Sequence, residues 1–580
     1  MSKIFLQKNK YFLVLLIFFI SCNQKFLDNK NNYTQDLLTK TQHYDSDILR
    51  GSNTEFRNWW NVLHYDITFK PNYKNKSISG SVTMHLQVTN EDNNGIIQID
   101  LQEPMQITEI IQLKADNIDS NQIVIENVIS GDKWIRDRNA YFIDISHLPK
   151  ERDSQFTLQM YFEGKPKIAK QAPWDGGWIF KEDELGRPWM SAAVQGLGSS
   201  AWFPSKDYWG DEPDQGVKIS ILVPEDLVAI ANGKLWESSF VKDEVGNNIY
   251  TWEVQNPINT YNIIPYIGYY KNFKDEYVNS AGESLQLDYW VLDYNINWAK
   301  KQFSQVKPML EIFEDWMGSY PFYEDSYKLV EAPYLGMEHQ SNVAYGNGFE
   351  NGYLGEDRSG SGWGNQFDFI IIHESGHEWF GNSITAQDPA DMWIHEAFTT
   401  YTEVMYVEGR FGVKAANEYV QGLKPAILND RPMIGILGKH KAGSIDMYNK
   451  GANMIHTLRQ WMDDDVKFKQ LIRDINKTFY HQTITSVQLE GFILQETGLP
   501  LEPFFNQYLR QKDIPILETK EENGELYYRW RNTIPEFNMP VKLEKSVEWI
   551  KPTTTWQVYA EKSQLKPDSN FLIEFEKSIK

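Results

Sequence analysis

Residues 367–384 have the sequence FDFIIIHESGHEWFGNSI, and this stretch decides how the rest of the chain is interpreted. Its residues favour a helix. His373 and His377 are four residues apart, so in a helix both imidazoles project from one face and can bind one cation. Glu374 lies beside them, and in the H-E-x-x-H arrangement this glutamate takes a proton from water at the metal instead of binding the metal itself. The stretch therefore predicts a metal site, with two structural helix-surface histidines as the alternative.

A candidate third ligand, Glu396, lies nineteen residues after His377 in a second predicted helix, WIHEAFTTYTEVMYVEGRFG, over residues 393–412. Two helices joined by a short turn can place this carboxylate over the histidine pair. Zinc is the natural metal for two imidazoles and a carboxylate, and three protein ligands leave the fourth position open for water or substrate. We therefore expect one Zn²⁺ ion per chain, although Glu396 taken alone is more typical of a solvated helix residue. Glu403 follows on the same helical face, where it either hydrogen-bonds a ligand histidine or faces solvent.

The spacing of these residues resembles that of peptidase family M1, the gluzincin aminopeptidases that include aminopeptidase N and leukotriene hydrolase. Eighteen residues separate His377 from Glu396. Residues 334–339 (YLGMEH) resemble the family's G-x-M-E-N exopeptidase signature, and residues 448–452 (YNKGA) resemble its Y-E-K-G-A segment. The resemblance covers about residues 45–580 and implies the family's chemistry for this chain.

The resemblance implies a catalytic role for each matching residue. His373, His377 and Glu396 match the zinc ligands, Glu374 matches the general base, and Tyr448 matches the tyrosine whose hydroxyl stabilises the tetrahedral oxyanion. Zinc lowers the pKa of bound water to roughly 7 and polarises the scissile carbonyl, and a donor such as Tyr448 is worth about 10²–10³ in rate. Taken alone, Tyr448 would be interpreted as a packing aromatic, since the chain has 31 tyrosines.

The same resemblance implies a substrate-binding segment. Glu338 matches the carboxylate that binds the free α-amino group of the substrate, and Gly336 and Met337 belong to the same signature. A free ammonium pairs with such a carboxylate, whereas an internal peptide nitrogen cannot, so Glu338 implies cleavage at the N-terminus of peptides. Gln195 either corresponds to the family's glutamine-containing substrate loop or is an ordinary loop residue, because Leu197 stands where an acidic partner is expected.

The sequence departs from the family pattern at four further positions, none of which carries a catalytic group. Leu335, His339, His395 and Asn449 stand where the family has glycine, asparagine, asparagine and glutamate. The shape of the specificity pocket, and with it the preferred first residue, therefore does not follow from the sequence. Larger members carry a long C-terminal helical domain that is not expected here, so we expect a more open active-site cleft.

Residues 1–22 form a predicted lipoprotein signal peptide. A lysine-bearing segment precedes the apolar run YFLVLLIFFI, which is too short for a comfortable transmembrane span. Residues 19–22 (FISC) resemble the lipobox of bacterial lipoproteins, although Phe19 replaces the usual aliphatic residue. We expect lipidation of Cys22, the only cysteine, with a plain signal peptide as the alternative. The protein would then be exported and held to a membrane by a lipid, in the bacterial periplasm, at the outer membrane or at the cell surface.

The remaining sequence predicts a multidomain α+β fold. A tether at 23–44 precedes an N-terminal all-β domain at 45–272, where apolar and polar residues alternate between turn-forming residues. Helical spacing over most of 273–505 predicts the zinc catalytic domain, for which the resemblance implies a thermolysin-like fold. Alternation returns at 506–580, which we interpret as a small β-sandwich-like domain.

Composition narrows the function. The formal net charge is −22 with no dense cluster of Lys and Arg, which argues against nucleic acid as a partner. We expect a zinc-dependent aminopeptidase that acts on peptides with a free N-terminus. The alternatives are a zinc metallohydrolase of another specificity, either an endopeptidase or an enzyme for a non-peptide substrate, and a catalytically silent peptide-binding surface lipoprotein. Cleavage of substrates with a blocked N-terminus would favour the first alternative, and absence of zinc from the purified protein would favour the second.

Overall fold

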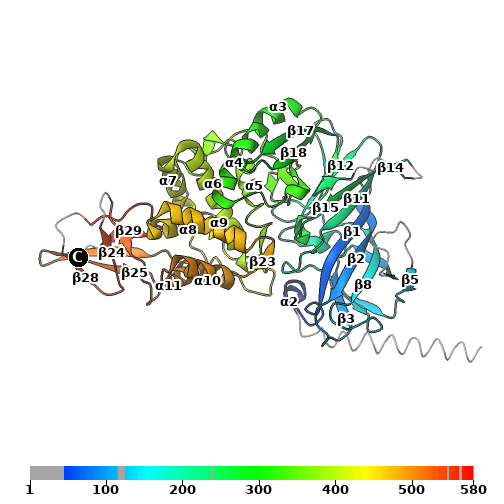
Figure 1. Cartoon of the computed structure of the whole chain (residues 1–580), viewed down its shortest axis with the longest axis horizontal. Helices are drawn as coiled ribbons and strands as arrows, with labels where there is room; N and C mark the ends of the chain where they lie inside the picture. The colour runs from blue at the N-terminus through cyan, green and yellow to red at the C-terminus, as the bar shows by residue number, and fades with distance from the viewer. Residues whose placement is uncertain are drawn as a thin grey trace, which may run out of the picture.

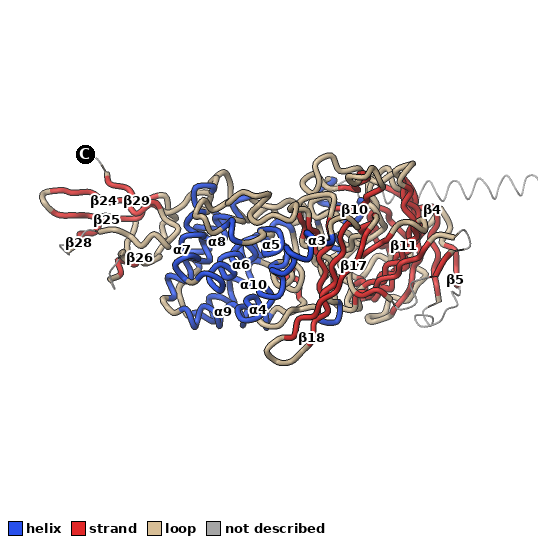
Figure 2. Tube along the Cα trace, turned by 90° about the horizontal axis from the view of Figure 1, so that it is seen from above, coloured by secondary structure: helices blue, strands red, loops and turns tan. Residues whose placement is uncertain are grey.

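The computed structural model of the chain describes residues 45–114, 125–236, 241–243, 246–544, 548–560 and 565–578. A strand-rich part, a helical part and a smaller strand-rich part follow one another along the chain (Figure 1). Seen from above, the helices lie in the middle with strands at both ends (Figure 2). The mixed α+β fold predicted from the sequence is confirmed. The predicted signal peptide, Cys22 and the tether lie outside the described residues, and none of the described helices is long and apolar enough to cross a membrane.

Nine strands of the described N-terminal part form one sheet. They are β13 (Lys234–Leu235), β15 (Asn248–Val254), β11 (Val217–Val223), β1 (Trp60–Asn72), β2 (Ser77–Val88), β8 (Gln155–Gly164), β4 (Gln106–Leu113) and β5 (Ile125–Val128) in spatial order, with β14 (Val241–Lys242) paired to β15. Along β1, buried side chains alternate with more exposed ones, as expected for a strand with one face on the core. β1 pairs antiparallel with β2 and parallel with β11.

Two smaller sheets complete this part. One contains β12 (Val228–Ile230), β16 (Tyr266–Gly268), β10 (Pro188–Ala193) and β9 (Gly177–Glu182), and the other contains β3 (Ile96–Asp100), β7 (Ala140–Asp144) and β6 (Trp134–Asp137). The segment that follows β10 contains Gln195, so the first of these sheets delivers the predicted substrate loop to the helical part.

A five-stranded sheet leads from the N-terminal part to the helices. It contains β17 (Tyr270–Val278), β18 (Ser284–Leu292), β19 (Tyr327–Glu331), β21 (Val343–Tyr345) and β20 (Gly336–Met337) in spatial order. The domain boundary expected after residue 272 therefore falls inside β17. β20 is the short strand that holds Gly336 and Met337 of the predicted substrate-binding signature.

The helical part surrounds α6, which packs against α4, α5, α7 and α8. Its helices are α3 (Ile296–Gln302), α4 (Val306–Met317), α5 (Phe369–Gly376), α6 (Trp393–Phe411), α7 (Val413–Gly422), α8 (Asn449–Met462), α9 (Asp465–Thr478), α10 (Ser486–Thr497) and α11 (Glu502–Arg510), with β22 (Ile384–Ala386) and β23 (Gln482–Ile484) paired in parallel beside them. One short helix, α2 (Ser46–Gly51), precedes β1.

One predicted helix is much shorter than its sequence pattern indicated. The apolar run in 367–384 favoured a helix throughout, but α5 ends at Gly376. The chain then turns, and Gly381 adopts a backbone φ of +130°, which only glycine adopts without strain. The turn brings residues 384–386 into β22 immediately before α6 begins.

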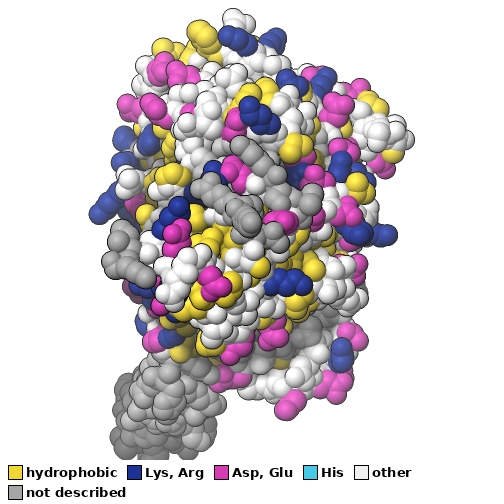
Figure 3. Space-filling view, turned by 90° about the vertical axis from the view of Figure 1, so that its left-hand side faces the viewer, with side chains coloured by type: hydrophobic (Ala, Val, Ile, Leu, Met, Phe, Trp, Pro, Cys, Tyr) yellow, Lys and Arg dark blue, Asp and Glu magenta, His cyan; other side chains and the backbone are white. Residues whose placement is uncertain are grey.

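The C-terminal part is a separate group of strands. β28 (Gln557–Tyr559), β25 (Glu525–Arg531), β24 (Ile516–Glu522) and β29 (Glu574–Lys577) form one sheet, and β26 (Val541–Lys542) pairs with β27 (Trp549–Ile550). The boundary expected after residue 505 lies inside α11. Seen from this end of the molecule, Lys and Arg side chains are interspersed with Asp and Glu (Figure 3).

Candidate functional site

The two histidines of the HESGH segment retain the geometry expected of one helix face although α5 is short. Asp368 caps the helix by accepting hydrogen bonds from Ile370 N (3.1 Å) and Ile371 N (3.3 Å). His377 follows the last helical residue, but its backbone is still helical, with φ −63° and ψ −19°. The imidazole of His373 therefore lies one turn from that of His377, with ring centroids 5.0 Å apart.

Glu396 completes the predicted triad from the first turn of α6. Its Oε2 atom lies 3.7 Å from His373 Nε2 and 3.3 Å from His377 Nε2, and all three residues are buried. Glu396 Oε2 has no hydrogen-bond partner within the described residues. A buried carboxylate oxygen without such a partner, facing two imidazole nitrogens, is the donor set that a zinc ion satisfies. The residues present therefore fit one zinc ion.

The outward-facing nitrogens of both imidazoles are engaged elsewhere. His373 Nδ1 lies 2.7 Å from Glu403 Oε1, and His377 Nδ1 lies 2.9 Å from the carbonyl oxygen of Phe380. The hydroxyl of Tyr419 donates to the other Glu403 oxygen (2.5 Å). Such partners fix ring orientation and leave both Nε2 atoms directed at the metal position. Burial acts against the charged form of His373, but Glu396 and Glu403 raise its pKa to about 10, so metal binding here releases a proton.

Two further carboxylates face the same space. Ligand atoms of Glu338, Glu374 and His377 lie within 4.8 Å of one another. His377 thus belongs both to this set and to the triad with His373 and Glu396. Burial raises the pKa of Glu374 to about 7 and also raises that of Glu338. A carboxyl group whose pKa lies near neutrality can both accept and return a proton, which is what general acid-base chemistry requires.

Glu338 is held by two donors that meet at one of its oxygens. Gln195 Nε2 donates to Glu338 Oε1 in a short hydrogen bond, and the hydroxyl of Tyr261 donates to the same atom (3.0 Å). Gly336 comes close to the other carboxylate, because a Cβ at this position would lie 2.8 Å from Glu374 Oε1. Met337 lies beside it in β20 and is buried. The predicted substrate-binding segment thus borders the carboxylate pair.

Tyr448 lies at the start of α8, directly before Asn449. Its ring stacks on the imidazole of His373, with centroids 6.0 Å apart. Burial, and then the carboxylates of Glu396 and Glu338, raise the pKa of this phenol well above its usual value. Tyr448 therefore stays protonated and can donate a hydrogen bond at the metal position.

Two of the departures from the family pattern have structural roles. His395 Nε2 accepts a hydrogen bond from Ala386 N (2.7 Å), and the ring stacks on Trp209 at 5.5 Å. His339 Nδ1 lies 2.6 Å from the hydroxyl of Tyr266. Burial lowers the pKa of each imidazole to about 3, so both are neutral packing residues beside the site.

Comparison with known families agrees with this geometry. Residues 61–262 match the model of the peptidase M1 N-terminal domain, and residues 302–508 match the model of the peptidase family M1 domain. The chain is 23% identical to aminopeptidase M1 of Arabidopsis thaliana over 325 residues, which are 53% of this chain and 35% of that protein. It is 22% identical to human aminopeptidase N over 444 residues, or 70% of this chain and 43% of that protein. The chain thus spans less than half the length of either relative.

Solved structures share the fold at low sequence identity. The M1 zinc metallopeptidase from Deinococcus radiodurans aligns with a TM-score of 0.62 and 19% identity, over 79% of this chain and 95% of that one. Native yeast LTA4 hydrolase aligns with a TM-score of 0.63 and 17% identity, over 79% of this chain and 69% of that one.

Proposed function

The chain belongs to peptidase family M1, and on that basis we propose that it is a zinc-dependent aminopeptidase that removes N-terminal residues from peptides. The observation that carries the proposal is one buried space that brings together the His373, His377 and Glu396 triad and the carboxylates of Glu374 and Glu338. The triad supplies three zinc ligands of the right chemistry. The two carboxylates supply groups for proton transfer and for binding an ammonium.

Each proposed role follows from the residue's surroundings. Zinc, when bound, supplies a Lewis acid that polarises a carbonyl and lowers the pKa of water. Glu374, with its pKa near 7, accepts the proton of the attacking water and returns it to the leaving amine. The hydroxyl of Tyr448 donates to the oxyanion as negative charge develops on the carbonyl oxygen. The negative charge that lines the space favours a substrate that brings a positive one.

Glu338 gives the proposal its direction along the peptide. Its Oε1 already accepts two hydrogen bonds, so the carboxylate is fixed in place before substrate arrives. A substrate ammonium pairs with this carboxylate, and the first peptide bond of the substrate then lies at a fixed distance from Glu338. An internal peptide nitrogen carries no charge and has no such partner.

The test of this function is Glu338→Gln compared with the unaltered protein on L-leucine p-nitroanilide and on its N-acetylated form. We expect the unaltered protein to cleave only the free amine. We expect Glu338→Gln to raise KM for that substrate by at least about 30-fold, because losing one partner of a buried charge pair costs about 2–5 kcal/mol. Glu490→Gln, which changes a carboxylate paired with Arg510, is the control. Equal cleavage of the acetylated substrate by the unaltered protein would refute an aminopeptidase.

We also propose that the protein is a membrane-held lipoprotein, supported by the apolar run and the lipobox-like residues 19–22. Acyl chains on Cys22 provide an attachment of about 0.8 kcal/mol per buried methylene. Expressed in a bacterium, the protein is expected in the membrane fraction, with a mass increase on its N-terminal peptide. Cys22→Ser should move it to the soluble fraction, and a Cys22→Ser variant that stays with the membrane as before would contradict lipidation.

A further inference from the structure

The short helix α2 lies at the junction of the N-terminal and helical parts (Figure 1), just ahead of the residues matched by the family's N-terminal model. It contacts two loops, one of which reaches Glu338 directly and the other through two aromatic residues. One is the Gln195 loop, defined as residues 194–201, and the other is the His440 loop, defined as residues 435–441. Helix α2 itself contributes none of the candidate metal ligands or carboxylates.

Arg50 in the last turn of α2 is the contact with the Gln195 loop. Its Nη2 donates to the carbonyl oxygen of Gly196 (2.9 Å), the residue directly after Gln195. Its Nε lies 4.0 Å from Asp207 Oδ2. The Arg50 side chain is 26% exposed, and Nε has no hydrogen-bond partner within the described residues. Arg50 thus ties the backbone of the Gln195 loop to α2 and to a buried carboxylate.

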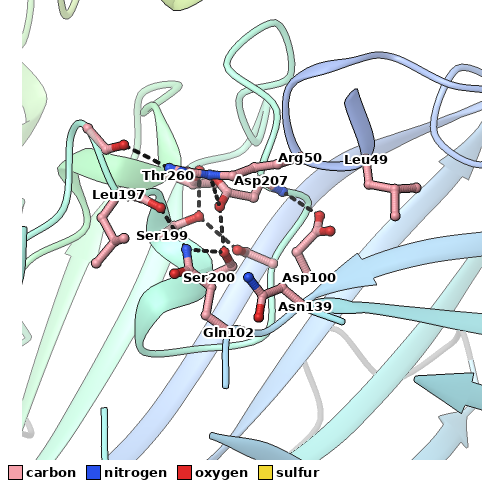
Figure 4. A network of polar contacts seen from close by, with 12 residues as sticks. Leu49, Arg50, Asp100, Gln102, Asn139, Leu197, Ser199, Ser200, Asp207 and Thr260 are labelled. Atoms are coloured by element: carbon pink, nitrogen blue, oxygen red, sulfur yellow. Dashed lines mark hydrogen bonds and ion pairs between the residues drawn. The ribbon is translucent and has the colours of Figure 1, made fainter. Parts of the chain in front are cut away.

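The loop is held on its other side as well. Ser200 donates to Asp207 Oδ2 (2.5 Å), and Gln102 Nε2 donates to the carbonyl oxygen of Leu197 (2.6 Å). Figure 4 shows Arg50 and Asp207 gathered with Ser200 and Gln102 around the Gln195 loop. A Cβ on Gly198 would lie 2.0 Å from Asp207 Oδ2, so loop and carboxylate are already in tight contact. Arg50 closes this network from the α2 side.

The other side of α2 is pressed against the His440 loop. A Cβ on Gly51 would lie 2.4 Å from the backbone nitrogen of His440, so helix and loop touch through their backbones. Ser52 Oγ donates to the carbonyl oxygen of Gly438 (2.9 Å). Two short ion pairs, Asp45 with Lys439 and Asp47 with Lys441, add charge contacts at the edge. Helix α2 therefore joins the two loops to each other.

Both loops lead to the same oxygen of Glu338. From the first, Gln195 Nε2 donates to Glu338 Oε1. From the second, the ring of His440 meets Trp209 at 5.9 Å, and Trp209 stacks on Tyr261 at 4.9 Å. The hydroxyl of Tyr261 is the other donor to Glu338 Oε1.

We propose that α2 is a positioning element for Glu338, and that Arg50 is its principal residue. By fixing both loops, α2 holds the Gln195 amide and the Tyr261 hydroxyl in place, and these hold the carboxylate that receives the substrate ammonium. The inference rests on the proposed function for its catalytic consequence. Arg50 touches no reacting atom, so its loss should weaken binding of the free amine and leave proton transfer largely intact.

The experiment compares Arg50→Met with Arg136→Met in the full-length chain. Arg136 is a matched control because its side chain is 22% exposed, donates to the carbonyl oxygens of Met105 and Leu101, and lies 4.0 Å from a carboxylate of Glu103. We expect Arg50→Met to raise KM for L-leucine p-nitroanilide by about tenfold with kcat within about twofold, a size typical of coupling through neighbouring residues. Arg50→Lys should recover part of the loss. Amide hydrogen exchange of residues 194–201 should be faster in Arg50→Met alone.

An unchanged KM in Arg50→Met overturns the proposal. So does an equal fall of kcat and melting temperature in Arg50→Met and Arg136→Met, because Arg50 would then be merely structural. If the unaltered protein does not cleave the free amine, the proposed function fails, and hydrogen exchange alone decides whether Arg50 fixes the loop. Equal amide hydrogen exchange of residues 194–201 in Arg50→Met and Arg136→Met would then refute the role of Arg50.

If Arg50→Met folds poorly, a charge-reversal pair tests the contact between α2 and the His440 loop. Asp47→Lys should raise KM because it replaces the ion pair with Lys441 by a repulsion between two positive charges. The double variant Asp47→Lys with Lys441→Asp should restore KM because it re-forms the ion pair with the charges exchanged. A double variant as impaired as the single one would contradict a role for the contact between α2 and the His440 loop.

Discussion

Glu374→Gln is expected to lower kcat for L-leucine p-nitroanilide by at least about 10²–10⁴-fold, the usual contribution of a general base, while the zinc content stays at one ion per chain. Glutamine has the size of glutamate but cannot take a proton from water. Glu374 does not belong to the His373, His377 and Glu396 triad, so its replacement leaves the three metal-binding groups in place. Rate and metal content, measured on the same preparation, separate loss of the base from loss of the metal.

A matched control measures how much activity is lost merely because a buried carboxyl group is replaced by an amide. Glu331 is buried like Glu374, and burial also raises its pKa to about 7, but it accepts hydrogen bonds from Leu292 N and Asn295 outside the site. Glu331→Gln should keep kcat within a few-fold of the unaltered protein. If Glu374→Gln retained most of its activity with zinc bound, the proton would have to move through another group, and the proposed mechanism would be wrong.

The sequence was sufficient to predict that His373, His377 and Glu396 lie close together, because the geometry of this candidate metal site is mostly local. The spacing of His373 and His377 fixes their shared helix face, and α6 begins where its pattern predicted, which brings Glu396 opposite them. The limits of α5 were not predictable from periodicity. A buried apolar run looks alike whether it continues as helix or turns, and here the turn at Gly381 ends it.

The surroundings of the site depend on contacts far apart in the chain, and these were missed. Tyr261 and Glu338 are 77 residues apart, and Tyr419 meets Glu403 from a different helix. Tyr261 and Tyr419 are two of the 31 tyrosines in the chain, and neither lies in a recognisable motif. Gln195 was predicted only as one of two alternatives, and its contact with Glu338 depends on the loop after β10 reaching the residue that follows β20, a strand of another sheet. Periodicity and spacing carry no information about such pairings.

Removal of one metal ligand has the other large expected effect. His377→Ala should lose zinc and reduce hydrolysis to background, because two of the three proposed ligands remain. A ligand present at 100 times its Kd stabilises the fold by about 2.7 kcal/mol, so a chelator should lower the melting temperature of the unaltered protein. The same chelator should leave the melting temperature of His377→Ala unchanged. His456→Gln, which alters a buried histidine beside Tyr401, is the control and should behave like the unaltered protein.

The fall in melting temperature caused by the chelator should also depend on Glu403. This dependence would distinguish a metal site from a cluster held together only by ion pairs. Glu403 touches His373 Nδ1 and no metal-facing atom of the triad. Glu403→Gln should therefore keep zinc but bind it about 10–100-fold more weakly, the usual cost of losing such a partner. Titration with a competing chelator would then order the unaltered protein, Glu403→Gln and His377→Ala by decreasing affinity. If His377→Ala kept zinc as tightly as the unaltered protein, the metal would lie elsewhere, since no arrangement of the remaining pair retains the full affinity of three ligands.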